Sequence, residues 1–522
     1  MFWEPKAPLL LRKSRQRGGI MSEIKVNQLT YAYEGSFDNI FEDVSFSIDT
    51  NWKLGFIGRN GKGKSTFLNL LLGKYPYEGK IITDMVFDYF PYQITEKQRS
   101  QSPIEFVEDL KPGLELWRVY VEMDKLQAKP ELLNRPFQTL SFGEQTKLLL
   151  AVLFSGENDF LLIDEPTNHL DKDSREIIKG YLSQKKGFIL VSHDRDLLDA
   201  CVDHVLVLNR STIEVQNGNF SSWWENKERK DAFAIAENEK HIKEIGKLKE
   251  AAGRVKVWAD KNEATKIGFD PIKEPDRFLN TRAYIGAKTK KMQSRVKQMK
   301  NRIEAEIQEK EGLLQDIEKT VDLKIEPLSY HKETVISAYQ YGLGYLDAEN
   351  LLFDSLSFEI KRGERVFLSG KNGCGKSSLI KSILNQKTNM KETGELRNPA
   401  NLIISYINQD TSHLSGSLPD YCRSHDLDES LFCSILRKLD LGREQFSKNL
   451  EDYSEGQKKK VLIAASLMTP AHLYIWDEPL NYIDVFSRIQ IEKLILKYQP
   501  TMLIVEHDVK FQEKIATKVI PL

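Results

Sequence analysis

Two glycine-rich stretches decide the fold of this chain: GRNGKGKS at Gly58–Ser65 and GKNGCGKS at Gly370–Ser377. Each follows a short apolar run, WKLGFIG or RVFLSG, and precedes a segment with helical spacing, TFLNLLLG or SLIKSIL. Glycines let the backbone curl so that its N–H groups and the start of the following helix can surround a phosphate. One such match can arise by chance, but two matches at one spacing predict phosphate-binding loops rather than simple turns.

The chain is a duplication built around this motif. Aligned on itself, it matches at a nearly constant offset of 312 to 316 residues, which indicates a repeated domain. The matching pairs are Tyr33 and Tyr345, Phe46 and Phe358, Gly58 and Gly370, Lys64 and Lys376, Gln93 and Gln409, Asp164 and Asp477, and His193 and His507. We therefore expect one domain at 22–218, a second at 330–522 and a connecting segment at 219–329.

The remaining stretch, 1–21, begins MFWEPKAPLLLRKSRQRGGI. Its apolar run precedes its basic residues, the reverse of a secretory signal, and it has no amphipathic period. We expect a non-native or disordered extension, with Met21 as the physiological start.

Polar residues follow the apolar runs in both copies. FLLIDEP and LYIWDEP end in two carboxylates, and FILVSHD and MLIVEHD end near a histidine. Functional residues at the carboxyl ends of buried strands are typical of an open, parallel α/β sheet. The fold class predicted is α/β, with two phosphate-binding domains joined by a long helical hairpin.

The residue types at these strand ends suit nucleotide hydrolysis. The loop lysines would neutralise the β- and γ-phosphates, and the serines after them would place a hydroxyl on Mg²⁺. The aspartates would hold Mg²⁺ through its water shell, the glutamates would act as general bases, and the histidines would sense the γ-phosphate. The residues are Lys64, Ser65, Asp164, Glu165 and His193 in the first copy, and Lys376, Ser377, Asp477, Glu478 and His507 in the second.

Composition limits the class of protein. A chain of 522 residues, 40% hydrophobic and 29% charged, is typical of globular proteins with two to four domains. No run approaches the roughly 20 apolar residues needed to span a bilayer. The four cysteines form no CxxC pair, which argues against a zinc site or disulfide framework and fits a reducing, cytoplasmic location.

The connecting segment carries the charge asymmetry. From Arg254 to Arg302 there are 14 Lys or Arg against 5 Asp or Glu, a local charge of +9 in a chain of net charge -1. Within Ser221–Thr320 the only prolines, Pro271 and Pro275, lie in one loop-like interval, so we expect two helices folded back on each other. Helices of about 35 to 40 residues would give an arm of roughly 50 to 60 Å.

These motifs resemble two ATP-binding-cassette domains in one polypeptide. The family signature is matched by Ser141–Gln145 and Ser454–Gln457, the glutamine loops by Gln93 and Gln409, and the adenine-stacking aromatic by Tyr33 and Tyr345. The resemblance implies that the halves dimerise head to tail within one monomer, so that Ser454 and Gly456 close the ATP on Lys64, and Ser141 and Gly143 close the ATP on Lys376.

By this resemblance the cofactors are ATP and Mg²⁺. The ATP-binding residues implied are Tyr33, Gly58, Asn60, Gly61, Gly63, Lys64, Ser65, Thr66, Gln93, Ser141, Gly143 and Asp164, and Tyr345, Gly370, Asn372, Gly373, Gly375, Lys376, Ser377, Ser378, Gln409, Ser454, Gly456 and Asp477. The metal-binding residues implied are Ser65, Gln93, Asp164, Ser377, Gln409 and Asp477.

The chain departs from the cassette pattern in places. Phe142 and Glu455 replace the first signature glycine, and Leu480 replaces the usual Thr after Glu478-Pro479. Glu506 precedes His507 where a small hydroxyl residue is commoner, and a second acid beside a phosphate should be repulsive. We expect both sites to bind ATP and at least one to hydrolyse it.

Tandem cassettes with a basic helical linker resemble the ABC-F family of ribosome-associated ATPases, and within it the Lsa-like branch that protects the large subunit from lincosamides, streptogramin A and pleuromutilins. The resemblance implies a 70S ribosome partner, with the linker in the tRNA exit site against large-subunit rRNA and tRNA. Basic residues of GAKTKKMQSRVKQMKNR would contact phosphates, and Trp258 and Phe269 would approach the drug site. The linker residues are Trp258, Phe269, Arg282, Lys288, Lys290, Lys291, Arg295 and Lys297.

Three alternatives stay open. The chain could be a housekeeping ABC-F translation factor, an ATPase subunit of a transporter, or a DNA-directed ATPase. A transporter subunit has little use for a basic hairpin, and no transmembrane partner is expected. DNA-repair relatives carry long insertions where the intervals here, Gln93 to Ser141 and Gln409 to Ser454, are short.

Overall fold

The computed structural model describes residues 23–34, 39–156, 159–168, 170–209, 211–264, 290–291, 294–303, 305–307, 323–347, 350–386, 389–399 and 401–522. The chain divides into two units, Met1–Trp223 with Thr320–Leu522, and Trp224–Lys319. We call the halves of the first unit cassette 1 and cassette 2, and the second unit the linker. The N-terminal extension predicted at 1–21 lies outside the described residues.

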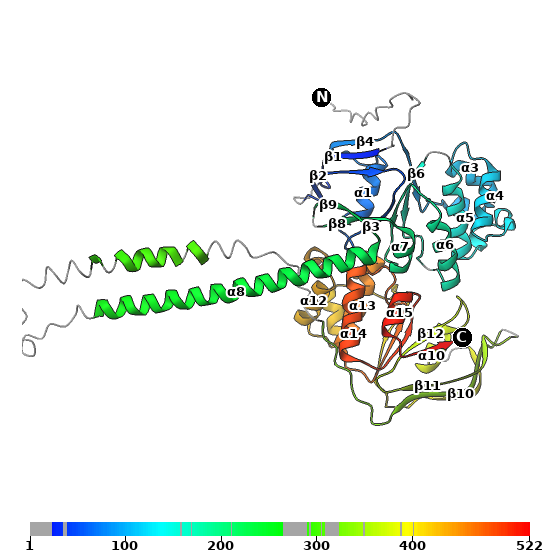
Figure 1. Cartoon of the computed structure of the whole chain (residues 1–522). Coiled ribbons are helices and arrows are strands. Elements are labelled where there is room, and N and C mark those ends of the chain that lie inside the picture. The colour runs from blue at the N-terminus through cyan, green and yellow to red at the C-terminus, as the bar shows by residue number, and fades with distance from the viewer. Residues whose placement is uncertain are drawn as a thin grey trace, which may run out of the picture. The chain divides into compact units, whose positions relative to one another are not determined.

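Cassette 1 is built on a six-stranded sheet of order β5-β6-β7-β3-β8-β9, parallel except at the β8–β9 pair, and on an antiparallel sheet β2-β1-β4. The strands are β1 (Glu23–Tyr31), β2 (Phe41–Asp49), β3 (Lys53–Ile57), β4 (Glu78–Ile82), β5 (Val86–Phe90), β6 (Asp159–Asp164), β7 (Phe188–Val191), β8 (His204–Leu208) and β9 (Ile213–Asn217). The helices are α1 (Lys64–Leu71), α2 (Glu96–Ser100), α3 (Pro103–Leu110), α4 (Leu116–Lys125), α5 (Phe142–Phe154), α6 (Lys172–Ser183) and α7 (Arg195–Cys201), with 3-10 turns η1 (Pro130–Asn134) and η2 (Phe137–Thr139). Figure 1 shows α3, α4 and α5 gathered beside the sheets.

Cassette 2 repeats this plan with a parallel sheet β14-β15-β16-β12-β17 and an antiparallel sheet β11-β10-β13. The strands are β10 (Thr334–Tyr345), β11 (Phe353–Lys361), β12 (Arg365–Ser369), β13 (Met390–Arg397), β14 (Ile404–Ile407), β15 (Leu473–Asp477), β16 (Met502–Val505) and β17 (Lys518–Pro521). The helices are α10 (Lys376–Ile383), α11 (Leu418–Ser424), α12 (Glu429–Lys438), α13 (Glu455–Met468), α14 (Val485–Tyr498) and α15 (Val509–Ile515), with turns η3 (Arg443–Ser447) and η4 (Leu450–Asp452).

The parallel sheets are buried on both faces, as their apolar runs require. Every residue of β7, FILV, is buried, and so is every residue of β15, LYIWD. In each sheet the strand before the glycine loop lies next to the strand that precedes the histidine, β3 beside β7 and β12 beside β16. In each cassette the glycine loop, the carboxylate pair and the histidine therefore lie at the carboxyl edge of its own parallel sheet. The predicted α/β fold class is confirmed.

Most of one long helix, α8 (Phe220–Ala264), of 45 residues, belongs to the linker. At 1.5 Å per residue it is about 68 Å long, longer than the sequence suggested. Further helical residues are described at 290–291, 294–303 and 305–307. The loop predicted between these helical segments lies outside the described residues.

A bulge in the middle strand of the antiparallel sheet is repeated in both cassettes and depends on a glycine in the neighbouring strand. Gln28 and Gln340 adopt positive φ angles of 50° and 44° in β1 and β10. Opposite Gln340, Gly394 has φ +72°, and a Cβ there would lie 2.0 Å from the Gln340 carbonyl oxygen. Gly79 faces Gln28 in the same way. No side chain fits at either glycine without moving backbone.

We predict that Gly394→Ala destabilises the protein by about 2 kcal/mol or more, because left-handed strain and a backbone clash add together. Thermal unfolding followed by circular dichroism measures it. Gly180→Ala is the matched control, since Gly180 is helical with open space at its Cβ, and it should raise the stability by about 0.5–1 kcal/mol. A Gly394→Ala protein that melts at the temperature of the parent would contradict this account.

Candidate functional site

Each glycine loop holds its lysine against loop carbonyls. Lys64 Nζ donates to the carbonyl of Gly58 at 2.7 Å, and Lys376 Nζ donates to the carbonyl of Gly370 at 2.8 Å. Burial lowers the pKa of Lys64, against the attraction of nearby carboxylates. The loops thus hold a buried cation beside the first turn of α1 and of α10.

The helices that follow the loops begin without a side-chain cap. Their N-cap residues are Gly63, with φ +109°, and Gly375, with φ +105°, and neither helix start receives a side-chain cap. Gly61 and Gly373 also have positive φ. Backbone N–H groups at such a helix start are suited to an anion. This geometry fits the phosphate-binding role predicted for the loops.

A serine and an aspartate meet behind each loop. Ser65 Oγ donates to Asp164 at 2.9 Å, and Ser377 Oγ donates to Asp477 at 2.9 Å. Burial raises the pKa of Asp477 to about 6, and its Oδ1 atom is buried without a hydrogen-bond partner. Tyr89, which the sequence reading did not single out, donates its hydroxyl to Asp164 at 3.1 Å.

The serine and aspartate oxygens fit Mg²⁺, which prefers oxygen ligands. Within the described residues, no group of three or more His, Cys, Asp or Glu side chains could hold a metal ion. Water and nucleotide phosphates would therefore supply the remaining ligands, as in other Mg²⁺–nucleotide sites. The bound ion would neutralise charge on the phosphates.

Both glutamates sit in strained backbone just past a buried strand. Glu165 has φ +50° and Glu478 has φ +48°, a region that non-glycine residues seldom adopt. Their N–H groups donate to the carbonyls of Val191 at 2.9 Å and Val505 at 3.0 Å on the adjacent strands. Strain held by the surrounding structure is characteristic of functional positions.

The two glutamates differ in electrostatic setting. Burial, with the charge of Asp164, raises the pKa of Glu165 to about 8. Burial also acts to raise the pKa of Glu478, but His507, Lys459 and other cations hold it below its usual value. The sites are therefore not equivalent, although their predicted residues are.

The predicted glutamines are also unequal in position. Gln409 Nε2 donates to Glu478 Oε2 at 2.8 Å, and Asn481 Nδ2 donates to the same atom at 2.7 Å. Gln93 is exposed in the loop after β5. The structure thus brings Gln409, but not Gln93, into hydrogen-bond contact with a glutamate among the described contacts.

The histidines lie beside the glutamates. His193 Nε2 is 3.4 Å from Glu165 Oε1 and 2.9 Å from Asn60 Oδ1. His507 Nε2 is 3.7 Å from Glu478 Oε1. Burial, together with the charge of Lys64, holds the pKa of His193 well below its usual value. A neutral imidazole there could donate a hydrogen bond to a phosphate oxygen.

The two predicted stacking aromatics lie over the starts of α1 and α10. Tyr33 and Thr66 hydroxyls are 2.8 Å apart, and Tyr345 and Ser378 hydroxyls are 3.0 Å apart. Tyr33 and Tyr345 are 44% and 40% exposed, so part of each side chain is open to solvent. Both fit the predicted role.

The signature residues begin two buried helices. Ser141 caps α5 and Ser454 caps α13, each in a reciprocal capping box. A Cβ on Gly456 would lie 2.6 Å from the carbonyl oxygen of Tyr482, so the signature of cassette 2 packs against the loop after Glu478. A Cβ on Gly143 would lie 2.9 Å from a serine hydroxyl.

Each glycine loop also meets the opposite cassette. Asn60 Nδ2 donates to the carbonyl of Tyr482 at 2.7 Å. In the reciprocal position, the backbone of Asn372 hydrogen-bonds Asp171, and Lys371 lies 3.5 Å from Asp173. These contacts agree with the head-to-tail arrangement that the sequence implied.

The linker residues are only partly described. Lys290, Lys291, Arg295 and Lys297 are helical and exposed. Trp258 lies in α8. Phe269, Arg282 and Lys288 fall outside the described residues. No helix in the described part of the chain has the length and apolar character to cross a membrane.

Comparison with known proteins agrees with this geometry. A family model described as ABC transporter matches residues 41–168 and 353–481. The chain is 28% identical over 509 residues to ribosome protection protein VmlR of Bacillus subtilis (strain 168), covering 95% of this chain and 86% of that protein. It is 25% identical over 576 residues to ABC transporter F family member 5 of Arabidopsis thaliana, covering 97% and 76%.

The chain belongs to the ABC-F family. As a member it is an ATPase with nucleotide-binding cassettes. A solved complex of archaeal ribosomal stalk protein aP1 and ribosome recycling factor aABCE1 has the same fold, with a TM-score of 0.60 and 17% identity, covering 95% of this chain and 87% of that one. The roles of individual residues in this ABC-F chain stay predictions.

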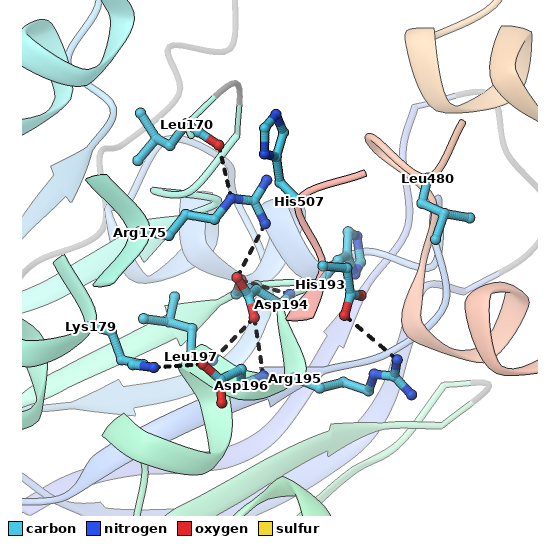
Figure 2. Close-up of polar contacts among 12 residues, drawn as sticks. Leu170, Arg175, Lys179, His193, Asp194, Arg195, Asp196, Leu197, Leu480 and His507 are labelled. Atoms are coloured by element: carbon cyan, nitrogen blue, oxygen red, sulfur yellow. Dashed lines mark hydrogen bonds and ion pairs between the residues drawn. The ribbon is translucent and has the colours of Figure 1, made fainter. Parts of the chain in front are cut away.

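This ABC-F chain has an ion pair behind each histidine that the sequence reading missed. Arg175 lies between the carbonyl of Leu170, at 3.0 Å, and Asp194, at 3.3 Å (Figure 2). Arg488 makes the same contacts in cassette 2, with Asp508 at 2.9 Å and backbone carbonyls after Glu478. The repeat offset is 313 for the arginines and 314 for the aspartates. Both values fall within the 312 to 316 range of the duplication, and that match was the available signal.

Glu506, expected to repel phosphate, is instead tied into the protein. Its Oε1 accepts a hydrogen bond from Leu480 N at 2.7 Å and its Oε2 from His507 N at 3.0 Å. Glu506 is also the leading acid among those that offset the lowering of the Lys459 pKa by burial. Cassette 1 has Ser192 and Thr146 at these two positions. Cassette 2 therefore has both an additional acid, Glu506, and an additional cation, Lys459, at these positions.

We predict that Glu506→Ser destabilises cassette 2 by about 3 kcal/mol, because it leaves Lys459 buried with less compensation. Adding Lys459→Thr, the residue of cassette 1, should recover most of the loss. Denaturant unfolding of the full chain and of both variants measures the coupling. Two substitutions with simply additive effects would show that the residues act independently.

Proposed function

We propose that this chain is a cytoplasmic, ribosome-associated ATPase that binds the 70S ribosome at the tRNA exit site and protects the peptidyl-transferase centre from lincosamide, streptogramin A and pleuromutilin antibiotics. The observation that carries the proposal is the similarity to a ribosome protection protein over 95% of the chain. A similarity this extensive includes the linker, which is the part of the chain that distinguishes a ribosome-directed cassette protein from a transporter subunit.

The linker supports RNA as its partner. Exposed cations follow one another along the helical residues 290–291 and 294–302. They lie in a segment, GAKTKKMQSRVKQMKNR, with seven cations and no acid. Cations on a helix contact phosphates without reading base sequence, which suits structured RNA. The 45 residues of α8 make a helix of about 68 Å, a length suited to an extended RNA-binding arm.

The cassettes would time the action of the linker. ATP held by Lys64 and Lys376 closes the two cassettes on each other, and the closed form binds the ribosome. Hydrolysis, with Glu165 and Glu478 as general bases for the attacking water, then opens the cassettes and releases the protein. Binding and release would thus be coupled to the nucleotide.

We predict that Glu165→Gln combined with Glu478→Gln traps the protein on ribosomes, because ATP still closes the cassettes but neither general base remains. Sedimentation through a sucrose cushion with ATP should bring down several-fold more of this variant than of the parent. Expression of the variant should arrest growth.

The trapped variant also provides the test of the linker. Adding Arg295→Glu and Lys297→Glu should weaken ribosome binding and flatten its dependence on salt, since two phosphate contacts are lost. A trapped variant that stays in the supernatant, or that binds DNA in preference to ribosomes, would overturn the proposal.

Drug resistance needs its own measurement. We predict that the parent chain raises the inhibitory concentration of a lincosamide, a streptogramin A and a pleuromutilin in a sensitive host, whereas a variant with Lys64→Ala and Lys376→Ala does not. A small-subunit antibiotic is the matched control and should be unaffected. Ribosome binding without any change in susceptibility would assign the chain a housekeeping role in translation.

A further inference from the structure

The two cassettes share their ion pairs but diverge one residue later. Asp194 and Asp508 follow the histidines in equivalent positions, yet the next residues are Arg195 and Val509. The residue that Arg195 meets, Glu492, has Lys179 as its counterpart in cassette 1. The two cassettes therefore carry different charges at these equivalent positions: Arg195 corresponds to an uncharged valine, and Glu492 corresponds to a lysine.

Arg195 makes a buried link between the cassettes. Its guanidinium donates to Glu492 of α14 and lies 3.7 Å from Asp508. Arg195 is 4% exposed, Glu492 2% and Asp508 1%. Arg488 and Arg195 together hold the pKa of Asp508 below its usual value, although burial acts to raise it. Breaking a pair buried this deeply leaves an uncompensated charge.

The same link closes a ring of contacts around the ATP site of Lys64. From Arg195 the ring passes through Asp508 to Arg488, which donates to the backbone carbonyls of residues 480 and 483. Between them, the carbonyl of Tyr482 accepts from Asn60 in the glycine loop of cassette 1. Asn60 contacts His193, two residues before Arg195. The ring crosses between the cassettes twice.

A further ion pair between the cassettes lies on the Lys64 side of the interface. Arg59 is 3.0 Å from Asp440, and both side chains are about four-fifths buried. Among the described residues, the structure shows no buried ion pair of this kind between the cassettes on the opposite side, near Lys376. Val509 lies in a small cavity with Lys179 and His507. Lys179 pairs instead with Glu176 and Asp196 of its own cassette, the second pair being drawn in Figure 2.

The cross-cassette ion pair on the Lys376 side is much more exposed. Lys371 and Asp173 are 3.5 Å apart, with side chains 79% and 67% exposed. Exposed pairs contribute little because water screens them, whereas deeply buried pairs resist separation. Opening the interface on the Lys64 side therefore breaks buried ion pairs, whereas opening it on the Lys376 side breaks an exposed one.

We propose that Arg195 is a positioning residue that keeps the ATP site of Lys64 closed, so that the cassettes separate first at the ATP site of Lys376. Arg195 touches no nucleotide in this scheme. It acts by holding the loop of residues 480–484 against the glycine loop of cassette 1. The proposal rests on the assignment of ATP to Lys64 and Lys376, and not on the ribosome.

The test measures ATP release from the full chain carrying Glu165→Gln and Glu478→Gln, loaded with radiolabelled ATP and chased with excess unlabelled ATP. We expect two phases of equal size. Lys376→Ala should remove the fast phase and Lys64→Ala the slow one. Arg195→Val should speed the slow phase about tenfold or more and leave the fast phase within about twofold, since only one side loses a buried pair.

Exchanging four residues between the cassettes tests whether Arg195 acts on one ATP site or only stabilises the fold. Arg195→Val, Val509→Arg, Lys179→Glu and Glu492→Lys together should restore a slow phase, now removed by Lys376→Ala and no longer by Lys64→Ala. Asp173→Asn, which breaks the exposed pair, is the matched control and should change neither rate by more than about twofold.

Several results would overturn the proposal. These are a single phase in the starting protein, an unchanged slow phase in Arg195→Val, or equal acceleration of both phases, which is what a merely structural residue would give. If the four-residue exchange does not fold, the selectivity of Arg195→Val against Asp173→Asn decides alone. Failure to retain any ATP would instead overturn the assignment of the ATP sites.

Discussion

The ion pair between an arginine and the aspartate that follows each histidine is the contact on which the rest of the site depends. In cassette 2 one guanidinium, that of Arg488, reaches Asp508 at 2.9 Å and the carbonyls of Ile483 at 2.9 Å and Leu480 at 3.0 Å. It thereby fixes the strand end that carries the histidine to the loop that follows the glutamate. Low dielectric makes such a contact strong when every partner is present and costly when one is lost.

Comparison of the two cassettes distinguishes the site residues that both share from the surrounding residues that differ. Both cassettes keep the lysine in its loop, the serine on its aspartate and the glutamate at positive φ. They differ in the residues around these groups, where Glu506 and Lys459 stand in place of Ser192 and Thr146. The reacting groups are held in common geometry, while the charges around them set the two glutamates apart.

Sequence reasoning succeeded where a function is local. A glycine loop between a strand and a helix, or two carboxylates after an apolar run, is determined by neighbours in the chain, so Lys64 and Asp164 could be placed without a structure. Arg195 and Glu492 could not, because they lie 297 residues apart and meet only through folding. The contact between Glu506 and Leu480 N was missed for the same reason, since Leu480 comes from a different loop.

The start of α8, up to Trp223, belongs to the cassette unit and lies at the same interface. Trp223, near the start of α8, is 4% exposed and packs edge to face against Phe486 of cassette 2, with ring centroids 6.1 Å apart. The guanidinium of Arg59, in the glycine loop of cassette 1, lies 5.8 Å from the centroid of that same ring. One aromatic side chain therefore touches both the nucleotide loop and the first turn of α8.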